Sequence, residues 1–332
     1  MRSSLLFLSP ALALSFFAAA CSTSGALVAS GGAPDTLACD APCGPVTLAS
    51  GQQTPGPIVV ANGQAFWLST SLSSGGDGTL RSVPTAGGAV TDLASVLGAT
   101  PEVPNSLAAD DANVYWIANG GSEIEMISQA GTTLPQSLYS AAALPGGIAI
   151  GGGYVYTSSE QNVVRISTTG TVTVIAANTS CNQVAVDANQ VYCLNESLVV
   201  YPLSGEPAFS LLSPPAGGNT FVGLALDSAY AYVSEQSDGG PTYTFVRVPL
   251  AGGSPTTLAV GVPMTSQSFV VGSDGLFWVG GVAGTTNLPL MQLPTSGGTP
   301  TAVGTGDASF LFAAGPGVYL ATTSGSIVEQ GF

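Results

Sequence analysis

The sequence has no histidine and no lysine, and its cationic side chains are four arginines. These absences exclude a Ser-His-Asp triad, a Ser-Lys dyad, a Schiff base and a histidine-ligated metal. The 19 acidic residues leave a formal net charge of −15. Because so acidic a chain repels phosphate groups, we expect no nucleic-acid partner and no binding to an anionic lipid surface.

Charged residues and long apolar segments are also scarce. Charged residues make up 7% of the chain. Beyond the N-terminal region, Gly, Pro and Ser interrupt every apolar run before it reaches membrane-spanning length. Glycine and proline, in contrast, number 44 and 23. This composition favours many short strands joined by turns, and it disfavours helices.

The N-terminus carries an export signal. Arg2 supplies a positive charge, and Leu5 to Phe17 form an apolar segment too short for an ordinary spanning helix. Small residues then precede Cys21, which resembles the bacterial lipobox, where the cysteine is lipidated after cleavage. We expect residues 1–20 to be a lipoprotein signal peptide. The alternative is a plain secretory peptide cleaved after Ala18-Ala19-Ala20, and both versions export the protein.

The residues after Cys21 predict how the protein is held. Ser22 stands where an Asp would resemble an inner-membrane retention signal, which favours the outer membrane, on its periplasmic or its cell-surface face. Residues 21–44 are rich in Ser, Gly, Ala and Pro, which is typical of a flexible tether. We therefore expect membrane contact only through the lipid anchor.

One unit recurs seven times in the rest of the chain. It contains an apolar run, a short Asp/Asn/Gly turn, an aromatic strand, a third strand, a Gly-rich turn and a Thr/Val/Leu strand. The spacing of the units fits the roughly 40–50 residues of a four-stranded propeller blade. We predict an all-β fold in which residues 45–332 form a single seven-bladed β-propeller. The equivalent aromatic residues are Phe66, Tyr115, Tyr156, Tyr192, Tyr232, Phe277 and Tyr319.

The two ends of the chain predict how the ring closes. After Tyr319 there is room for one strand, from Ser326 to Gln330, so the last unit lacks a fourth strand. The segment Val46 to Ala49 matches the fourth strand of the unit that contains Leu258. We predict that Val46 to Ala49 joins the C-terminal blade, which would cover the terminal sheet edges.

The repeats resemble those of bacterial cell-surface lipoprotein β-propellers. The likeness rests on Tyr-Trp strands such as Val114-Tyr115-Trp116 and on Pro-x-x-Gly-Gly turns such as Pro84 to Gly88. TolB-like and NHL-type repeats belong to the same broad group but are more distant in pattern. The resemblance covers about residues 45–332, implies the propeller fold and carries no active-site signature. Propeller lyases that inactivate streptogramins also resemble this fold, but they depend on histidine.

Four cysteines remain once Cys21 is set aside, and their use fits an oxidising compartment. Cys39 and Cys43 are close enough in sequence to form a small ring in the tether. Cys181 and Cys193 belong to neighbouring strands of the fourth unit, where either a disulfide or two free thiols would fit. Zinc binding is the other alternative, but zinc-type spacing is absent. We predict no metal and no cofactor.

The repeat also predicts where a ligand would bind. In a meandering blade, the loops that lead into the first strand lie on the same face as the loops between the second and third strands. Polar residues in these loops form a candidate binding rim, although an ordinary hydrated surface would look the same. The rim residues are Asn105, Asn119, Glu160, Asn182, Gln183, Asn195, Glu196, Glu235, Gln236 and Gln267.

These observations favour a non-enzymatic, monomeric surface propeller that presents this rim to a protein or glycan partner. One alternative is an envelope assembly or scaffold factor. Another is a carboxylate- or metal-dependent hydrolase or lactonase. Glu123 and Glu125 share one face of a strand, but a solvated strand explains them as well. We assign no catalytic residue.

Overall fold

The computed structural model describes residues 44–70, 78–96, 106–159, 161–215, 217–238, 240–264, 268–281, 288–305, 307–315 and 317–332. The predicted signal peptide and nearly all of the predicted tether therefore lie outside the described residues. Within them the chain is entirely β-strand and turn, without a helix. Accordingly, this described part contains no helix that could cross a membrane.

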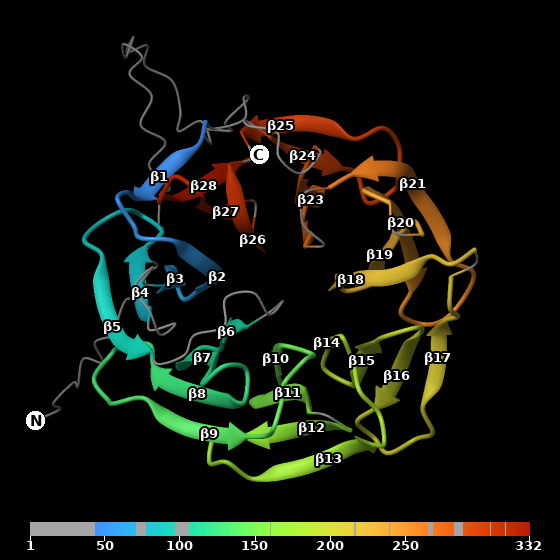
Figure 1. Cartoon of the computed structure of the whole chain (residues 1–332), viewed down its shortest axis with the longest axis horizontal. Helices are drawn as coiled ribbons and strands as arrows, with labels where there is room; N and C mark the ends of the chain where they lie inside the picture. The colour runs from blue at the N-terminus through green and yellow to red at the C-terminus, as the bar shows by residue number, and fades with distance from the viewer. Residues whose placement is uncertain are drawn as a thin grey trace, which may run out of the picture. The chain divides into compact units, whose positions relative to one another are not determined.

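The described residues form seven antiparallel sheets of four strands each, which confirms the predicted blades (Figure 1). The first three blades are β2 (Pro55–Ala61), β3 (Gln64–Thr70), β4 (Gly78–Pro84) and β5 (Thr91–Val96); β6 (Leu107–Ala109), β7 (Asn113–Ala118), β8 (Glu123–Ser128) and β9 (Gln136–Ser140); and β10 (Ile148–Gly151), β11 (Tyr154–Ser159), β12 (Asn162–Ser167) and β13 (Val172–Ala177). The next three are β14 (Gln183–Val186), β15 (Gln190–Leu194), β16 (Leu198–Pro202) and β17 (Phe209–Leu212); β18 (Thr220–Leu226), β19 (Tyr230–Gln236), β20 (Thr242–Pro249) and β21 (Thr256–Pro263); and β22 (Val270–Gly272), β23 (Gly275–Val279), β24 (Pro289–Leu293) and β25 (Thr301–Thr305). The seventh is β26 (Ala308–Ala314), β27 (Gly317–Thr322), β28 (Ile327–Gly331) and β1 (Val46–Ala49).

The blades form a closed ring around a centre. The first strand of each blade contacts the first strands of its neighbours, including β2 with β26, so the last blade meets the first. Figure 1 shows the first strands pointing toward the middle and the fourth strands on the circumference. Such a ring covers both faces of every sheet with neighbouring blades, which a single sheet cannot do.

The N-terminal strand closes the seventh blade as predicted. Val46 pairs with Glu329 and Thr47 pairs with Val328. Leu48 is 7% exposed and packs in one cluster with Trp67 and Tyr319. The closing strand therefore contributes buried apolar contacts as well as main-chain hydrogen bonds.

The third strand of this blade differs slightly from the prediction. We predicted Ser326 to Gln330, and β28 begins and ends one residue later. The main-chain N–H of Ser326 donates to the Thr322 hydroxyl at 2.8 Å, and its carbonyl accepts from the Thr322 N–H at 2.9 Å. Ser326 is therefore part of the turn, because its main-chain groups are used there.

The aromatic second strands form the core between blades. In blades one and two, Phe66, Leu68, Val114 and Trp116 belong to one buried cluster. A second strand is paired on both edges and covered on both faces, so most of its side chains are buried. Burying each large side chain stabilises the fold by about 1.5–3 kcal/mol. Aromatic side chains of the second strands, such as Phe66 and Trp116, thus pack between adjacent blades.

Candidate functional site

The loops that lead into the first strands and the loops between second and third strands form one surface, which we call the loop face. Asn105, Glu160 and Gln267 of the predicted rim lie outside the described residues. The other seven flank or occupy strand ends on this face, in blades two, four and five. They are Asn119, Asn182, Gln183, Asn195, Glu196, Glu235 and Gln236.

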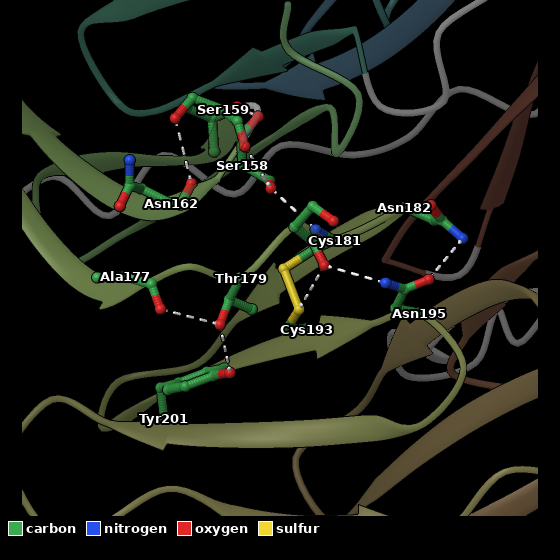
Figure 2. Close-up of a disulfide and its surroundings, with 12 residues drawn as sticks. Ser158, Ser159, Asn162, Ala177, Thr179, Cys181, Asn182, Cys193, Asn195 and Tyr201 are labelled. Atoms are coloured by element: carbon green, nitrogen blue, oxygen red, sulfur yellow. Dashed lines mark hydrogen bonds between the residues drawn. A yellow bond between two sulfur atoms is a disulfide. The ribbon is translucent and has the colours of Figure 1, made fainter.

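The rim is best defined in the fourth blade, where a disulfide holds it (Figure 2). Cys181 and Cys193 are joined, and each is at most 2% exposed. The Asn182 amide donates to Asn195 Oδ1 at 3.3 Å, and the Asn195 amide donates to the Ser180 carbonyl at 3.2 Å. Of the alternatives left open by the sequence, the structure has the disulfide. Two rim amides are therefore held together beside a covalent crosslink.

Gln183 follows directly in the chain and connects two blades. Its Oε1 accepts the main-chain N–H of Leu224, in the first strand of blade five, at 2.6 Å. This contact occurs where β18 departs from regular pairing, between Phe221 and Gly223. The hydrogen bond supplies an acceptor for a main-chain donor at this irregularity, and it fixes the orientation of the Gln183 amide.

A cavity of about 420 Å³ occupies the middle of the ring, and we call it the central channel. All seven first strands or the residues leading into them contribute to its lining. Most of the side chains are aliphatic or aromatic, and the polar side chains are those of Gln183 and Ser268. Among the described residues that line the channel, none carries an ionisable side chain. The polar side chains that could contact a ligand in the channel are therefore neutral.

The carboxylates of the rim and of β8 lie away from this channel lining. Burial raises the pKa of Glu235 above its usual value, and a hydrogen bond with Asn219 opposes that shift. Burial and then the neighbouring charge of Glu123 raise the pKa of Glu125. The Asn119 amide also donates to Glu123. A raised pKa suits a general acid, but none of these groups lines the central channel.

The remaining described rim residues lie in separate local environments. The Gln236 amide donates to the Gly240 carbonyl at 3.2 Å, within its own blade. Glu196 is exposed between β15 and β16. The structure thus brings Asn182 and Asn195 into contact, and it leaves Asn119, Glu196, Glu235 and Gln236 in local contacts or in solvent. Among the described residues, no three His, Cys, Asp or Glu side chains gather as a metal site would require.

Comparison with known proteins identifies the fold and no family. No family model and no curated protein matches the chain. Among solved structures, virginiamycin B lyase from Staphylococcus aureus is similar at 13% identity with a TM-score of 0.61, over 87% of this chain and 98% of that one. Oligogalacturonate lyase from Vibrio parahaemolyticus is similar at 10% identity with a TM-score of 0.63, over 86% and 91%.

A further similar structure is PorZ of Porphyromonas gingivalis, described as a surface component of the type-IX secretion system. It matches at 15% identity with a TM-score of 0.58, over 85% of this chain and 37% of that one. The structural similarity establishes the propeller architecture, whereas identities this low leave the chemistry open.

One recurring contact was missed by the sequence reasoning. In blade two, Asp110 Oδ1 accepts the main-chain N–H groups of Ala112 and Asn113, at 2.8 and 2.7 Å. The Tyr115 hydroxyl donates to Asp110 Oδ2 at 2.7 Å. Asp187 with Tyr192 and Asp227 with Tyr232 repeat this contact in blades four and five. The sequence signal is an Asp five residues before a Tyr, and the turn pattern alone accounts for that Asp without predicting the contact.

The Asp-Tyr contacts are structural features of the face opposite the loop face. Burial and then the hydrogen bond to Asp110 raise the pKa of Tyr115 well above its usual value. In blade seven, which has no Asp at this position, the Tyr319 hydroxyl donates to Glu329 Oε1 at 2.9 Å instead. All these tyrosines therefore stay neutral at physiological pH. Tyr115, Tyr192 and Tyr232 join the first turn of a blade to its second strand, whereas Tyr319 joins the second strand to the third.

Proposed function

We propose that this protein is an exported, lipid-anchored binding module without catalysis of its own, and that its loop face binds a neutral glycan. The observation that carries the proposal is the hydrogen-bonded amide pair Asn182 and Asn195 beside the Cys181–Cys193 disulfide. Amide groups both donate and accept hydrogen bonds, as sugar hydroxyls do. The net charge of −15 disfavours anionic ligands.

A non-enzymatic role is supported by the chemistry of the channel and of the chain. Within the described ranges, the channel lining has no acid, base or nucleophile beyond the hydroxyl of Ser268. A variant of the S. aureus lyase in which one histidine is replaced by alanine is described as catalytically inactive. This chain has no histidine at all, so that lyase chemistry does not transfer to it.

The binding proposal is tested with the Cys21→Ser chain, in which Ala18-Ala19-Ala20 still offers a secretory cleavage site. We expect it to bind neutral oligosaccharides on a glycan array and in calorimetry. Asn182→Ala with Asn195→Ala should weaken this binding at least tenfold. Asn189→Ala removes an exposed amide from the opposite face of the same blade, so it should leave binding unchanged. Equal weakening by both changes, or no glycan binding, would contradict the proposal.

Lipid anchoring has a separate test. Feeding an alkyne-labelled fatty acid to the producing bacterium should label the wild-type chain, and the label should disappear in Cys21→Ser. The variant should also move from the membrane fraction to the soluble exported fraction. Wild-type protein that carries no label but is still exported would support the plain secretory peptide instead. The buried disulfide agrees with an oxidising compartment.

An assembly role with a protein partner is the second candidate, and the outermost strands favour it. Val172 and Val174 of β13 are 44% and 54% exposed, and Val260 of β21 is 75% exposed. Exposed valines on a free strand edge can pair with a strand of another protein. Crosslinking in cells followed by purification should then recover a defined envelope complex, and Val172→Lys with Val174→Lys should abolish it.

A further inference from the structure

The walls of the central channel combine main-chain polar groups of the inner strands with apolar side chains that the fold leaves partly uncovered. Second-strand residues such as Trp116 and Tyr192 are fully buried. First-strand residues nearer the centre, among them Ile150, Leu226 and Val271, are only half-buried, although they lie in the middle of the ring. Uncovered apolar surface of this kind costs free energy in water in proportion to its area. An apolar occupant would recover that free energy.

The dimensions of the channel select an elongated occupant. Each first strand contributes up to four consecutive residues to the lining, as Pro57 to Val60 do in blade one. At roughly 3.3 Å per strand residue, this length corresponds to a channel on the order of 10 Å deep. A volume of about 420 Å³ lies within the range of pockets for small ligands. A single alkyl chain fits a narrow, deep space with walls on all sides.

The mouth of the channel meets the rim at Gln183. Gln183 belongs to the channel lining, and its neighbour Asn182 belongs to the amide pair. Because Gln183 Oε1 accepts from Leu224, the amide nitrogen of Gln183 can donate at this point, where it has no partner among the described residues. A polar head group would therefore meet neutral hydrogen-bonding groups where the apolar lining ends. The net charge of −15 makes an anionic head unfavourable.

We propose that the central channel binds the alkyl chain of a single-chain amphiphile whose neutral sugar head lies on the Asn182 and Asn195 rim. The head-group part of this inference rests on the proposed glycan function, whereas the channel part rests on the lining alone. The ligand class is thus an alkyl-linked or acyl-linked neutral saccharide.

The test uses the Cys21→Ser chain and the probes glucose, n-hexyl glucoside and n-octyl glucoside, titrated calorimetrically below their micelle concentrations. Each methylene that enters an apolar site should strengthen binding about fourfold, so octyl should exceed hexyl about fifteenfold. Ala109→Phe, which places a ring at a half-buried lining position, should remove this chain-length dependence. Val260→Phe on the outer circumference is the matched control and should not.

The outcomes separate the two proposals. Equal affinity for glucose and both glucosides would overturn the channel inference and leave glycan binding intact. Chain-length dependence that persists in Ala109→Phe, with its fold verified by circular dichroism, would also overturn the inference. If Ala109→Phe fails to fold, Leu311→Ala replaces it. Removing this lining side chain widens the channel, so the fourfold gain in affinity per methylene should then continue from octyl to decyl glucoside. Chain-length dependence without any effect of Asn182→Ala would support the channel and contradict the sugar rim.

Discussion

At the scale of single residues, the carboxylate of each Asp-Tyr contact accepts hydrogen bonds from two places, the main chain of the turn and the Tyr hydroxyl. One oxygen of Asp110 accepts two main-chain N–H groups of the turn, and the other accepts the Tyr115 hydroxyl. The turn and the second strand are therefore fixed to each other inside one blade. A hydrogen bond to a charged acceptor contributes more than a neutral one, in the range of about 1.5–3 kcal/mol.

Asp110→Ala should therefore lower the free energy of unfolding by about 1–3 kcal/mol. The neighbouring Asp111→Ala changes the same turn at an exposed side chain that makes no hydrogen bond within the described residues, so it should cost less than about 0.5 kcal/mol. Chemical denaturation measures both. Equal losses would show that the side-chain contacts of Asp110 contribute nothing.

The tyrosines of these contacts also determine how the stability of the fold changes at high pH. The pKa of Tyr115 is raised in the folded protein, so its contribution to stability is fully present below the usual value of about 10 and is lost as pH rises through the folded value. Asp110→Asn removes the carboxylate charge and should lower the pKa of Tyr115, while burial keeps it above the usual value. Ultraviolet absorbance of phenolate follows this titration.

At the scale of elements, the loop face is stabilised by crosslinks between strands. The Cys181–Cys193 disulfide ties the segment before β14 to β15, and Gln183 ties β14 to β18. The sequence separation of the two cysteines is 12. A short loop of this size restricts the unfolded chain moderately.

Replacing both cysteines by serine should lower the free energy of unfolding by about 2–3 kcal/mol. Reducing the wild-type protein with dithiothreitol should cause a similar loss. Thermal melting followed by circular dichroism checks both. A melting temperature that does not change on verified reduction would contradict the prediction.

The closing strand β1 allows a matched comparison within four residues. Leu48→Asp places an unpaired charge among Trp67 and Tyr319, so it should lower the free energy of unfolding by about 3 kcal/mol or more. Val46→Lys also adds a charge to this strand, but at a residue that is 52% exposed and lies opposite Glu329, so it should have little effect. Denaturant titration distinguishes the two. Similar stability of both variants would mean that closure depends on main-chain pairing alone.

At the scale of the whole molecule, the dominant property is charge of one sign. The net charge of −15 produces self-repulsion, and three arginines follow the predicted cleavage site. Within the described residues the recorded ion pair joins Arg81 and Asp92 at 2.7 Å. The folded state therefore concentrates negative charge that the unfolded chain spreads out.

Two changes of solution should both raise the melting temperature. Raising ionic strength from about 0.01 M to about 0.15 M shortens the screening length and weakens the repulsion. Lowering the pH from about 7 to about 5 acts through Glu125 and Glu235, whose pKa values are raised in the folded state. The contribution of these two groups to the free energy of unfolding is fully present below their pKa in the unfolded chain. It is lost as the pH rises through their pKa in the folded protein. Calorimetry that shows a lower melting temperature in salt would contradict the repulsion argument.

The sequence by itself determined the number of blades, the closing strand and the aromatic core between blades. A repeat encodes the strands and turns of a blade locally, because each unit contains its own turn residues and its own alternation of apolar and polar residues. Asn62 and Gly63, with φ of 49° and 69°, form the left-handed turn that their residue types require. The position of Val46 to Ala49 followed from a missing fourth strand near Tyr319.

Only the tertiary structure decided the contents of the site. The contact between Asn182 and Asn195, the Gln183 link to blade five and the lining of the channel depend on how strands distant in sequence approach one another. A linear pattern places polar residues on a loop face, but it does not give the distances between them. The apolar channel arises from the ring as a whole, because no single blade encloses space.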